Sequence, residues 1–449
     1  MSVLNINLRA SVLGRKRASA FLVAVAIAIT VVGFAADVHS TLSYPGSDLR
    51  NRVVGARLML EGIDPYLFKW QLGLSERFYD PLDDPSELVS KLSVPPTVLT
   101  LHGTIAPLSY LHQKVIWLLV QWGALAGTVW IFIRTSTFEK TPWILAVGFC
   151  FASSLFWRFH VSSGQIYIVY AFVLAIAWFF LQQKSRYRCV ISGFLAGVAA
   201  SLRPSFILFS IPFIVQKQYV FLLGGVSGFC SSLAVSYWVV GGFIWKRYIL
   251  TILQMTGLVD LAAYLSLDEG TLPSLNTVYP KIVEGFDWNV PYPLEHYFAD
   301  TSFYLPLNVL RVPNERGILI LGLMVTLVYL SVLIAKSLPE SKKTNHAFLI
   351  GVLICLLGDF FLPIPRFSYY DVQMILPLLL LVSQSDVDYL MSHWSRFVLL
   401  LGFFLGMVGF VAIPKALFFG GLAIGFYVTV MSVRLVKRSH AEMLHAIDS

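Results

Sequence analysis

The chain has 449 residues, of which 57% are hydrophobic and only 13% are charged, and its mean hydropathy is +0.72. A soluble domain is closer to about a quarter charged. This composition excludes a disordered chain, a collagen-like rod and a soluble nucleic-acid-binding protein, and it predicts an all-α protein that crosses a membrane many times. The four cysteines are scattered through apolar runs at spacings that suit neither a disulfide framework nor a zinc site.

About twelve apolar runs are long enough to cross, or nearly cross, a hydrocarbon layer of roughly 30 Å. They cover residues 19–36, 115–133, 143–159, 165–182, 189–202, 205–216, 219–240, 317–335, 346–362, 372–384, 396–412 and 415–433. A further run at 95–112 is short and opens with Pro95-Pro96. Because proline is best tolerated at the start of a helix, we expect a juxtamembrane half-helix at 95–112 that does not cross.

The charge distribution predicts the orientation of the spans. Basic residues gather before the first run and after the last run, and an even number of crossings places both ends in the cytoplasm, as the positive-inside rule requires. The net charge of +8 follows from this topology, since the basic excess falls on the inner side. We therefore expect a multi-pass protein of the plasma (inner) membrane, with one integral membrane domain over 1–449 and two long external loops, 37–95 and 241–316. The first run is interpreted as an uncleaved anchor, with a cleavable signal peptide as the alternative.

The first external loop carries the sharpest functional signal. Asp48 follows a Pro-Gly turn and precedes a helical stretch with Val53, Ala56 and Leu60 on one face. An aspartate in this place suits two roles. One is a cap for that helix, and the other is a general base held at the membrane surface.

Other charged residues of the same loop are expected to be solvated. Arg50 and Arg57 are interpreted as surface charges. The acidic group of Asp80, Asp83 and Asp84 is interpreted as a solvated loop, with metal binding as the minority alternative.

Five stretches of the chain, in order, resemble the motifs of one enzyme family. They are Asp48 with Ala56, Leu60 and Gly62-x-Asp64-Pro65-Tyr66; Pro95-Pro96; Gly164-Gln165; Gly193-x-x-x-Gly197 leading to Arg203-Pro204; and Pro365-Arg366-Phe367-Ser368-Tyr369-Tyr370-Asp371. In their order and their common external side they resemble glycosyltransferase family 87, whose members are polyprenyl-phosphate-sugar-dependent mannosyltransferases. The resemblance spans roughly residues 20–385. It implies the GT-C glycosyltransferase fold, with about twelve transmembrane helices and juxtamembrane helices in the first external loop.

The chain departs from the family pattern at three places. Val53-Val54 stands where the family usually has Tyr before the alanine, Arg203 stands where Lys is usual, and residues 369–371 carry Tyr-Tyr-Asp where the family tends to carry His. These differences bear on the sugar and the acceptor more than on the reaction class.

The resemblance implies that Asp48 is the catalytic general base. It would take the proton of an acceptor hydroxyl while that oxygen attacks the sugar, and a positioned base contributes about 10²–10⁴-fold in rate. A single displacement with one base predicts inversion at the sugar carbon. No pair of metal-ligating residues stands beside Asp48, so neither a metal nor another cofactor is expected.

A cation near the outer surface would stabilise a leaving polyprenyl phosphate. Arg203 ends an apolar run before Pro204, and its fork can hold phosphate oxygens bidentately. The alternative is that Arg203 extends to lipid headgroups, as arginines at span ends often do. Arg52 and Arg366 are further phosphate candidates. Gln165 suits a hydrogen bond to a sugar hydroxyl or, alternatively, the satisfaction of a broken helix end.

Three more residues are candidates for contact with the sugar or the acceptor, namely Tyr370, Asp371 and His296. His296 lies in an aromatic part of the second external loop, which also suits an interfacial belt of Trp and Tyr. We expect that loop to cover the site on the external, periplasmic side.

The sequence thus predicts a membrane glycosyltransferase with a polyprenyl-phosphate-linked sugar as donor. Mannose is the sugar that the resemblance implies, and arabinose or another pentose is the alternative. The expected acceptor is a glycolipid, a lipid-linked saccharide, another glycan or a protein, and the other partners are membrane lipids. Two rival interpretations remain open: a transporter or flippase of lipid-linked sugars, and a surface-polysaccharide polymerase or ligase.

Overall fold

The computed structural model describes residues 24, 27–255, 258–265, 279–289, 302–335, 340–361, 366–390, 393–408 and 416–448. The described residues form a bundle of α-helices, and the only sheet among them is one short antiparallel hairpin. The all-α class predicted from composition is confirmed.

Helices account for nearly all regular structure. The first runs over Ile27–Ser43. The next are α2 (Ser47–Leu60), α3 (Pro96–Gly103), α4 (Tyr110–Thr135), α5 (Thr141–Ser153), α6 (Leu155–Ser163), α7 (Tyr167–Leu181), α8 (Arg188–Leu202), α9 (Ile211–Val215) and α10 (Tyr219–Met255). The later ones are α11 (Leu261–Leu265), α12 (Tyr304–Val309), α13 (Glu315–Ala335), α14 (Glu340–Phe361), α15 (Ile375–Gln384), α16 (Val387–Leu390), α17 (His393–Val408) and α18 (Ala416–Asp448). Short 3-10 helices are η1 (Glu76–Phe78), η2 (Phe138–Lys140), η3 (Pro204–Ser210) and η6 (Ser368–Met374), and the strands are β1 (Ile282–Val283) and β2 (Phe286–Asp287).

Several helices are suited to a membrane. Five of the described helices are long and apolar enough to cross one, and up to seven spans result if each of two bent helix pairs is one span. One bent pair joins Ile27–Ser43 to α2 at 54°, and the other joins Phe138–Ser153 to α6 at 58°. Shorter apolar helices, α7 and α8 among them, lie beside the long ones. By length and composition the chain is an integral membrane protein, whereas twelve crossings and the orientation stay predictions.

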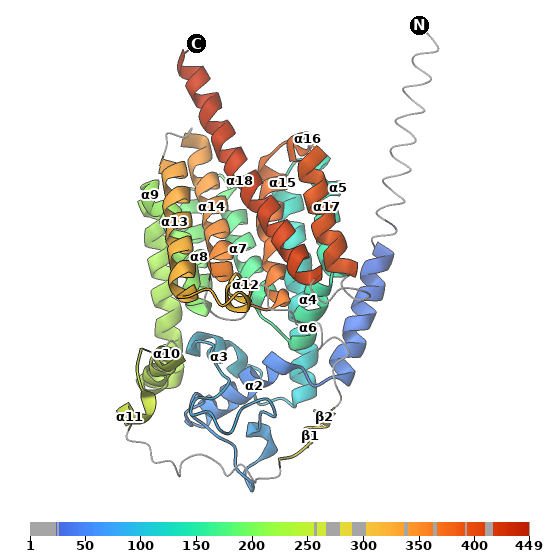
Figure 1. Cartoon of the computed structure of the whole chain (residues 1–449), viewed down its shortest axis with the longest axis vertical. Coiled ribbons are helices and arrows are strands. Elements are labelled where there is room, and N and C mark those ends of the chain that lie inside the picture. The colour runs from blue at the N-terminus through green and yellow to red at the C-terminus, as the bar shows by residue number, and fades with distance from the viewer. Residues whose placement is uncertain are drawn as a thin grey trace.

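The two ends of the bundle differ (Figure 1). At one end, α2, α3, the segment 61–95 and the β1–β2 hairpin form a layer across the helix ends, which we call the α2 layer. At the opposite end, α18 projects beyond its neighbours. The predicted half-helix at 95–112 is divided: α3 covers Pro96–Gly103, with Pro95 as its N-cap residue, and the long α4 begins at Tyr110.

The second predicted loop, 241–316, begins inside a helix. α10 continues past Gly241, where the backbone kinks with φ 76° and ψ 165°, and ends at Met255. Glycine adopts this positive φ without the steric cost that a Cβ would add. The kink carries the last turns of α10 down beside the α2 layer (Figure 1).

α8 and α10 lie in close backbone contact because glycines line their interface. A Cβ at Gly193 would clash with the carbonyl oxygen of Phe221, and a Cβ at Gly197 would clash with that of Gly225. A Cβ at Gly224 would likewise run into the backbone of α8. Small residues allow this close approach of helices in a membrane. Gly224 and Gly225 therefore lie at the packed interface of α8 and α10.

An ion-pair cluster ties the second loop to α2. Glu284, at the turn of the β1–β2 hairpin, accepts from Arg50 at 2.8 Å and also from Arg57. The backbone N–H of Tyr110, at the start of α4, donates to Glu284 at 3.2 Å. Both arginine side chains are almost wholly buried. The prediction that Arg50 and Arg57 are surface charges is therefore wrong: they hold three segments of the chain together.

The close packing of α8 on α10 gives a direct test. Gly197→Ala should lower the thermal stability, because the added methyl group collides with backbone that cannot move alone. Gly123→Ala in α4 is the matched control, since a Cβ there meets nothing within 4 Å. The control should be neutral or stabilising by about 0.5–1 kcal/mol. Equal melting temperatures of the two variants in detergent would contradict this account of the interface.

Candidate functional site

Asp48 lies in the first turn of α2, behind a turn that α4 fixes in place. Gly46, with φ 80°, is the N-cap residue and makes no side-chain cap. The hydroxyl of Tyr110 donates to the carbonyl of Pro45 at 2.6 Å. Asp48 is thus not the N-cap of α2. Its partly exposed carboxylate sits where the helix dipole favours a negative charge.

Gln165 is the hydrogen-bond partner of that carboxylate. Its Nε2 donates to Oδ2 of Asp48 at 2.5 Å. Gly164 ends α6 in the left-handed region, with φ 71°, and a Cβ there would collide with Leu49 of α2. Glycine therefore both turns the chain and lets α2 approach. The backbone N–H of Gln165 donates to the carbonyl of His160, so the side chain is not needed for the broken helix end.

Arg52 stands one turn beyond Asp48 on the same helix. It donates to the carbonyl of Gly164, to which the indole N–H of Trp117 also donates at 2.7 Å. The guanidinium lies 5.9 Å from the centroid of the Trp117 ring and is buried. It is close enough to Asp48 for electrostatic attraction. Arg52 therefore supports the ionised carboxylate from behind.

A group of tyrosines borders Asp48 and Gln165. Tyr167 opens α7, and Tyr369 and Tyr370 lie in η6. The ring centroids of Tyr167 and Tyr370 are 4.3 Å apart, and those of Tyr369 and Tyr370 are 5.4 Å apart. Gln165 also bonds to Tyr369. The sequence predicted Tyr370 but gave no special role to the other two rings.

Arg203 lies within the protein, on the far side of these rings. It donates to Asp359 at 2.7 Å and to Gln373 at 3.1 Å. Its guanidinium carbon lies 4.7 Å from the centroid of Tyr167 and 5.3 Å from that of Tyr370. Only 12% of the side chain is exposed, so Arg203 does not extend to lipid headgroups in this structure. Its pairing with Asp359 also neutralises much of its charge.

The remaining predicted site residues are either buried or lie outside the described part of the chain. Arg366 and Asp371 form an ion pair of 2.7 Å, and both are buried. A ligand role for either would require that pair to open, and it stays a prediction. His296 lies outside the described residues. Within the described part of the chain, no group of three or more His, Cys, Asp and Glu residues is placed to hold a metal ion.

The segment 61–95 is a folded part of the α2 layer. Lys69 stabilises this segment by donating to the carboxylate of Asp83 at 2.8 Å and to the backbone carbonyl of Asp84 at 2.7 Å. Asp80 is buried, and one of its oxygens accepts from the backbone N–H of Leu82 at 3.0 Å. The prediction that Asp80, Asp83 and Asp84 form a solvated loop is therefore wrong, except for the exposed Asp84.

Burial has an electrostatic consequence at Asp80. It raises the pKa of this carboxyl to about 6, against the hydrogen bond from Leu82 and the charges of Lys91 and Arg50. Desolvation disfavours the charged form of an acid, which explains the direction. Near neutral pH the carboxyl is thus ionised at a cost in folding free energy.

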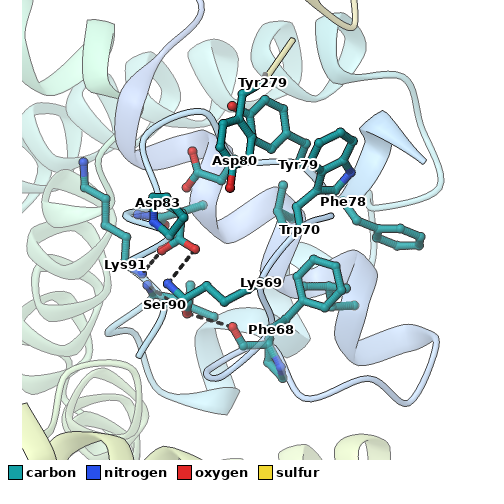
Figure 2. A pocket seen from close by; sticks show the side chains of 17 residues that line it. Phe68, Lys69, Trp70, Phe78, Tyr79, Asp80, Asp83, Ser90, Lys91 and Tyr279 are labelled. Carbon is teal, nitrogen blue, oxygen red and sulfur yellow. Dashed lines mark hydrogen bonds and ion pairs between the residues drawn. The ribbon is translucent and has the colours of Figure 1, made fainter. Parts of the chain in front are cut away.

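A small hollow lies between this segment and α2 (Figure 2). Its lining includes Asn51 of α2, the buried Asp80, the exposed Lys91 and the aromatic side chains of Trp70 and Tyr79. In Figure 2 the labelled aromatic side chains gather on one side, and Lys91 lies on the other. Lys91 is close enough to interact electrostatically with Asp48 as well as with Asp80. The hollow therefore adjoins the site around Asp48.

Sequence reasoning missed several of these residues. Lys91 is one lysine in a polar segment, and no spacing marks it. Asp359 ends an apolar run far from Arg203 in the chain, so their pairing needed the fold. Glu284 lies between Val283 and Gly285 in the second loop. A Glu-Gly pair between apolar residues can indicate a hairpin turn, and this was the one sequence signal for its position.

Taken together, the site offers a carboxylate, an amide donor, phenol hydroxyls and paired guanidinium groups at one end of the bundle. These groups suit proton removal from a hydroxyl and hydrogen bonding to hydroxyl or phosphate oxygens. Such groups do not by themselves select one reaction class.

Comparison with known proteins supplies that class. A family model described as glycosyltransferase family 87 matches residues 95–282, which include Gln165 and Arg203 but not Asp48. No curated protein and no solved structure gives a significant match to the chain. The family implies the GT-C fold and favours an enzyme over the transporter interpretation. The chain therefore carries a glycosyltransferase family 87 domain over residues 95–282, and this family implies a glycosyltransferase enzyme.

Proposed function

We propose that the protein transfers mannose from a polyprenyl-phosphate donor to an acceptor hydroxyl at the external face of the membrane. The transfer is an inverting single displacement with Asp48 as the general base. The observation that carries this proposal is the placement of Asp48: a partly exposed carboxylate without an ion pair among the described residues, oriented by Gln165.

The chemistry follows from that carboxylate. The acceptor O–H gives its proton to an oxygen of Asp48 while the acceptor oxygen forms a bond to the anomeric carbon. The bond from that carbon to the phosphate oxygen breaks on the opposite face, and the polyprenyl phosphate leaves with the electron pair. Gln165 and Ser47 hydrogen-bond to the carboxylate of Asp48 and orient it for this proton transfer.

The leaving phosphate needs donors that are already in place. Arg203 uses part of its fork on Asp359, Gln373 and Ser205, and no described residue occupies its other N–H groups. Because Asp359 offsets its charge, we infer that Arg203 contributes directed hydrogen bonds more than net positive potential.

The orientation rests on the two ends of the bundle. The site lies at the end that carries the α2 layer (Figure 1). At the opposite end, Lys342 and Arg438 line a polar cleft together with Gln182 and Thr135. Thr135 is the last residue of α4, and the first residue of α4, Tyr110, lies near Asp48, so α4 runs from the site to this cleft. The positive-inside rule assigns that basic end to the cytoplasm. We therefore place the site on the external, periplasmic side of the plasma membrane.

The base assignment predicts that Asp48→Asn lowers the transfer rate by about 10²–10⁴-fold. An amide cannot take the proton, but its oxygen can still accept from Gln165, so the fold should persist. The measurement is release of labelled sugar from polyprenyl-phosphate mannose by purified protein. Glu61→Gln is the matched control, since Glu61 is an exposed carboxylate at the end of the same helix. A rate within threefold of wild type for Asp48→Asn would end the base assignment.

The phosphate assignment predicts an effect on donor use. Arg203→Lys keeps a positive charge for Asp359 but loses the planar fork, so KM for the donor should rise about tenfold with less change in KM for the acceptor. Arg203→Ala is a poorer probe, because it strands a buried carboxylate at a cost of about 3–5 kcal/mol. Wild-type donor kinetics for Arg203→Lys, in protein of normal thermal stability, would reduce Arg203 to a structural partner of Asp359.

A further inference from the structure

We propose that the hollow between α2 and the segment 61–95 is the acceptor subsite, and that it binds one edge of a neutral saccharide. Hydroxyl groups of the acceptor would bond to Asp80, Asn51 and Lys91, beside the aromatic wall of Trp70 and Tyr79 (Figure 2). The identity of the ligand as an acceptor rests on the proposed glycosyl transfer, whereas the binding of a saccharide does not.

The hollow is a built feature, because both of its sides are fixed. Arg50 of α2 donates from Nε to the carbonyl of Tyr79 at 2.8 Å and from Nη2 to that of Glu76 at 2.7 Å. The opposite rim is closed against α2 at Gly55, where a Cβ would meet Leu92 at 2.7 Å. The lining residues are thus held in place before any ligand arrives.

The aromatic wall suits the face of a sugar. The ring centroids of Trp70 and Tyr79 are 4.7 Å apart, and Tyr279 stacks on Tyr79 at 5.7 Å. The indole N–H of Trp70 donates to the carbonyl of Ser75 at 3.1 Å, so the face of the ring remains as an apolar surface. Rings of this kind supply contact area at little entropic cost, because they have few rotatable bonds.

Three polar groups at the hollow keep unused hydrogen-bonding capacity. No described residue bonds to the side-chain amide of Asn51, to the ammonium of Lys91 or to the second carboxylate oxygen of Asp80. An amide both donates and accepts, an ammonium donates and a carboxylate accepts. Hydroxyl groups also donate and accept, so a polyol satisfies all three.

Ion pairing in the α2 layer singles out Asp80 together with Asp48. The buried or partly buried carboxylates described there are Asp48, Asp64, Asp80, Asp83 and Glu284. Three have partners: Arg247 for Asp64, Lys69 for Asp83, and Arg50 with Arg57 for Glu284. Asp48 and Asp80 have none among the described residues. A buried carboxylate without a cation is costly to keep, and a ligand hydroxyl would supply the missing hydrogen bond.

The hollow also lies at the right place for an acceptor. Asn51 follows Asp48 by three residues on α2, so their Cβ atoms are about 5–6 Å apart. A sugar ring whose edge is held at Asn51 can present another hydroxyl to Asp48. The open space at the hollow is about 40 Å³, which is room for about three hydroxyl oxygens and not for a whole ring. The ring must therefore lie across the rim.

Charge favours a neutral saccharide over a phosphate-bearing ligand. The lining carries Asp80 and Lys91 as its groups with unpaired charges, and these offset each other. A phosphate at this place would face the carboxylate of Asp80 and, nearby, that of Asp48.

The test compares Asp80→Asn with Asp84→Asn in full-length protein in nanodiscs. Asp84 is an exposed carboxylate of the same segment and does not line the hollow. Binding is measured by saturation-transfer NMR with methyl α-mannoside, methyl β-glucoside and methyl β-galactoside, which need no donor. We expect at least one glycoside to bind the wild type and the Asp84→Asn control alike, and to bind Asp80→Asn about tenfold more weakly, since a hydrogen bond to a charged group is lost. Absence of binding, or equal binding to all three proteins, would overturn the proposal.

Kinetics separate this subsite from the proposed function. With polyprenyl-phosphate mannose as donor and octyl α-mannoside as acceptor, Asp80→Asn should raise KM for the acceptor at least fivefold more than KM for the donor. Equal changes in both constants would overturn the acceptor assignment. If a methyl glycoside binds through Asp80 but no sugar leaves the donor in wild-type protein, the glycosyl transfer fails and the saccharide site stands.

Thermal unfolding distinguishes a ligand-binding Asp80 from a structural one. Since burial raises the pKa of Asp80 to about 6 from 3.8, its neutral form contributes stability that is complete below about pH 3.8 and is lost as pH rises through 6. Asp80→Asn avoids the buried charge and keeps an oxygen for Leu82. It should therefore melt above wild type at pH 8 and close to it below about pH 3.8. A lower melting temperature at pH 8 would assign Asp80 to the fold instead.

Discussion

The contact between Gln165 and Asp48 is the constraint on which the site depends. It exists because Gly164 reverses the chain in a conformation that favours glycine and because its lack of a side chain lets α2 approach. The same glycine gives its carbonyl to Arg52 and Trp117. One break between two membrane helices thus fixes the position of the carboxylate, its hydrogen-bond partner and the cation behind it.

Ion pairs engage many of the charged side chains described at the site end of the bundle, but not Asp48 or Asp80. Arginines that the sequence offers as free cations are engaged: Arg203 with Asp359, Arg366 with Asp371, and Arg50 with Glu284. Buried charges need such partners, since the loss of water around each ion is costly. Where pairing is the rule, a carboxylate without a pair stands out as a functional candidate. Asp48 and Asp80 are such carboxylates, and both lie in the α2 layer.

Local patterns predicted the parts of this protein that depend on local chemistry. Apolar runs predicted the helices, Pro95-Pro96 predicted the start of α3, and Gly164-Gln165 matched the break between α6 and α7. Contacts between distant segments could not be predicted from local patterns. Nothing in the sequence around Arg50 distinguishes it from a surface arginine, although it is buried against Glu284, which lies 234 residues later in the chain. Apolar runs do not determine the number of crossings for a related reason: broken and short apolar helices can be covered by neighbouring helices instead of spanning alone.

The proposed base and the proposed acceptor subsite are held by different parts of the protein. Asp48 and Gln165 are anchored to the bundle through α6, where a substitution would disturb helix packing. The hollow beside Asp80 is built instead from a segment held by side chain to backbone contacts, such as those of Lys69 and Arg50. Such contacts tolerate changes in the residues between them. Because the proposed base is separate from the proposed acceptor subsite, substitutions in the subsite can leave the geometry around Asp48 unchanged.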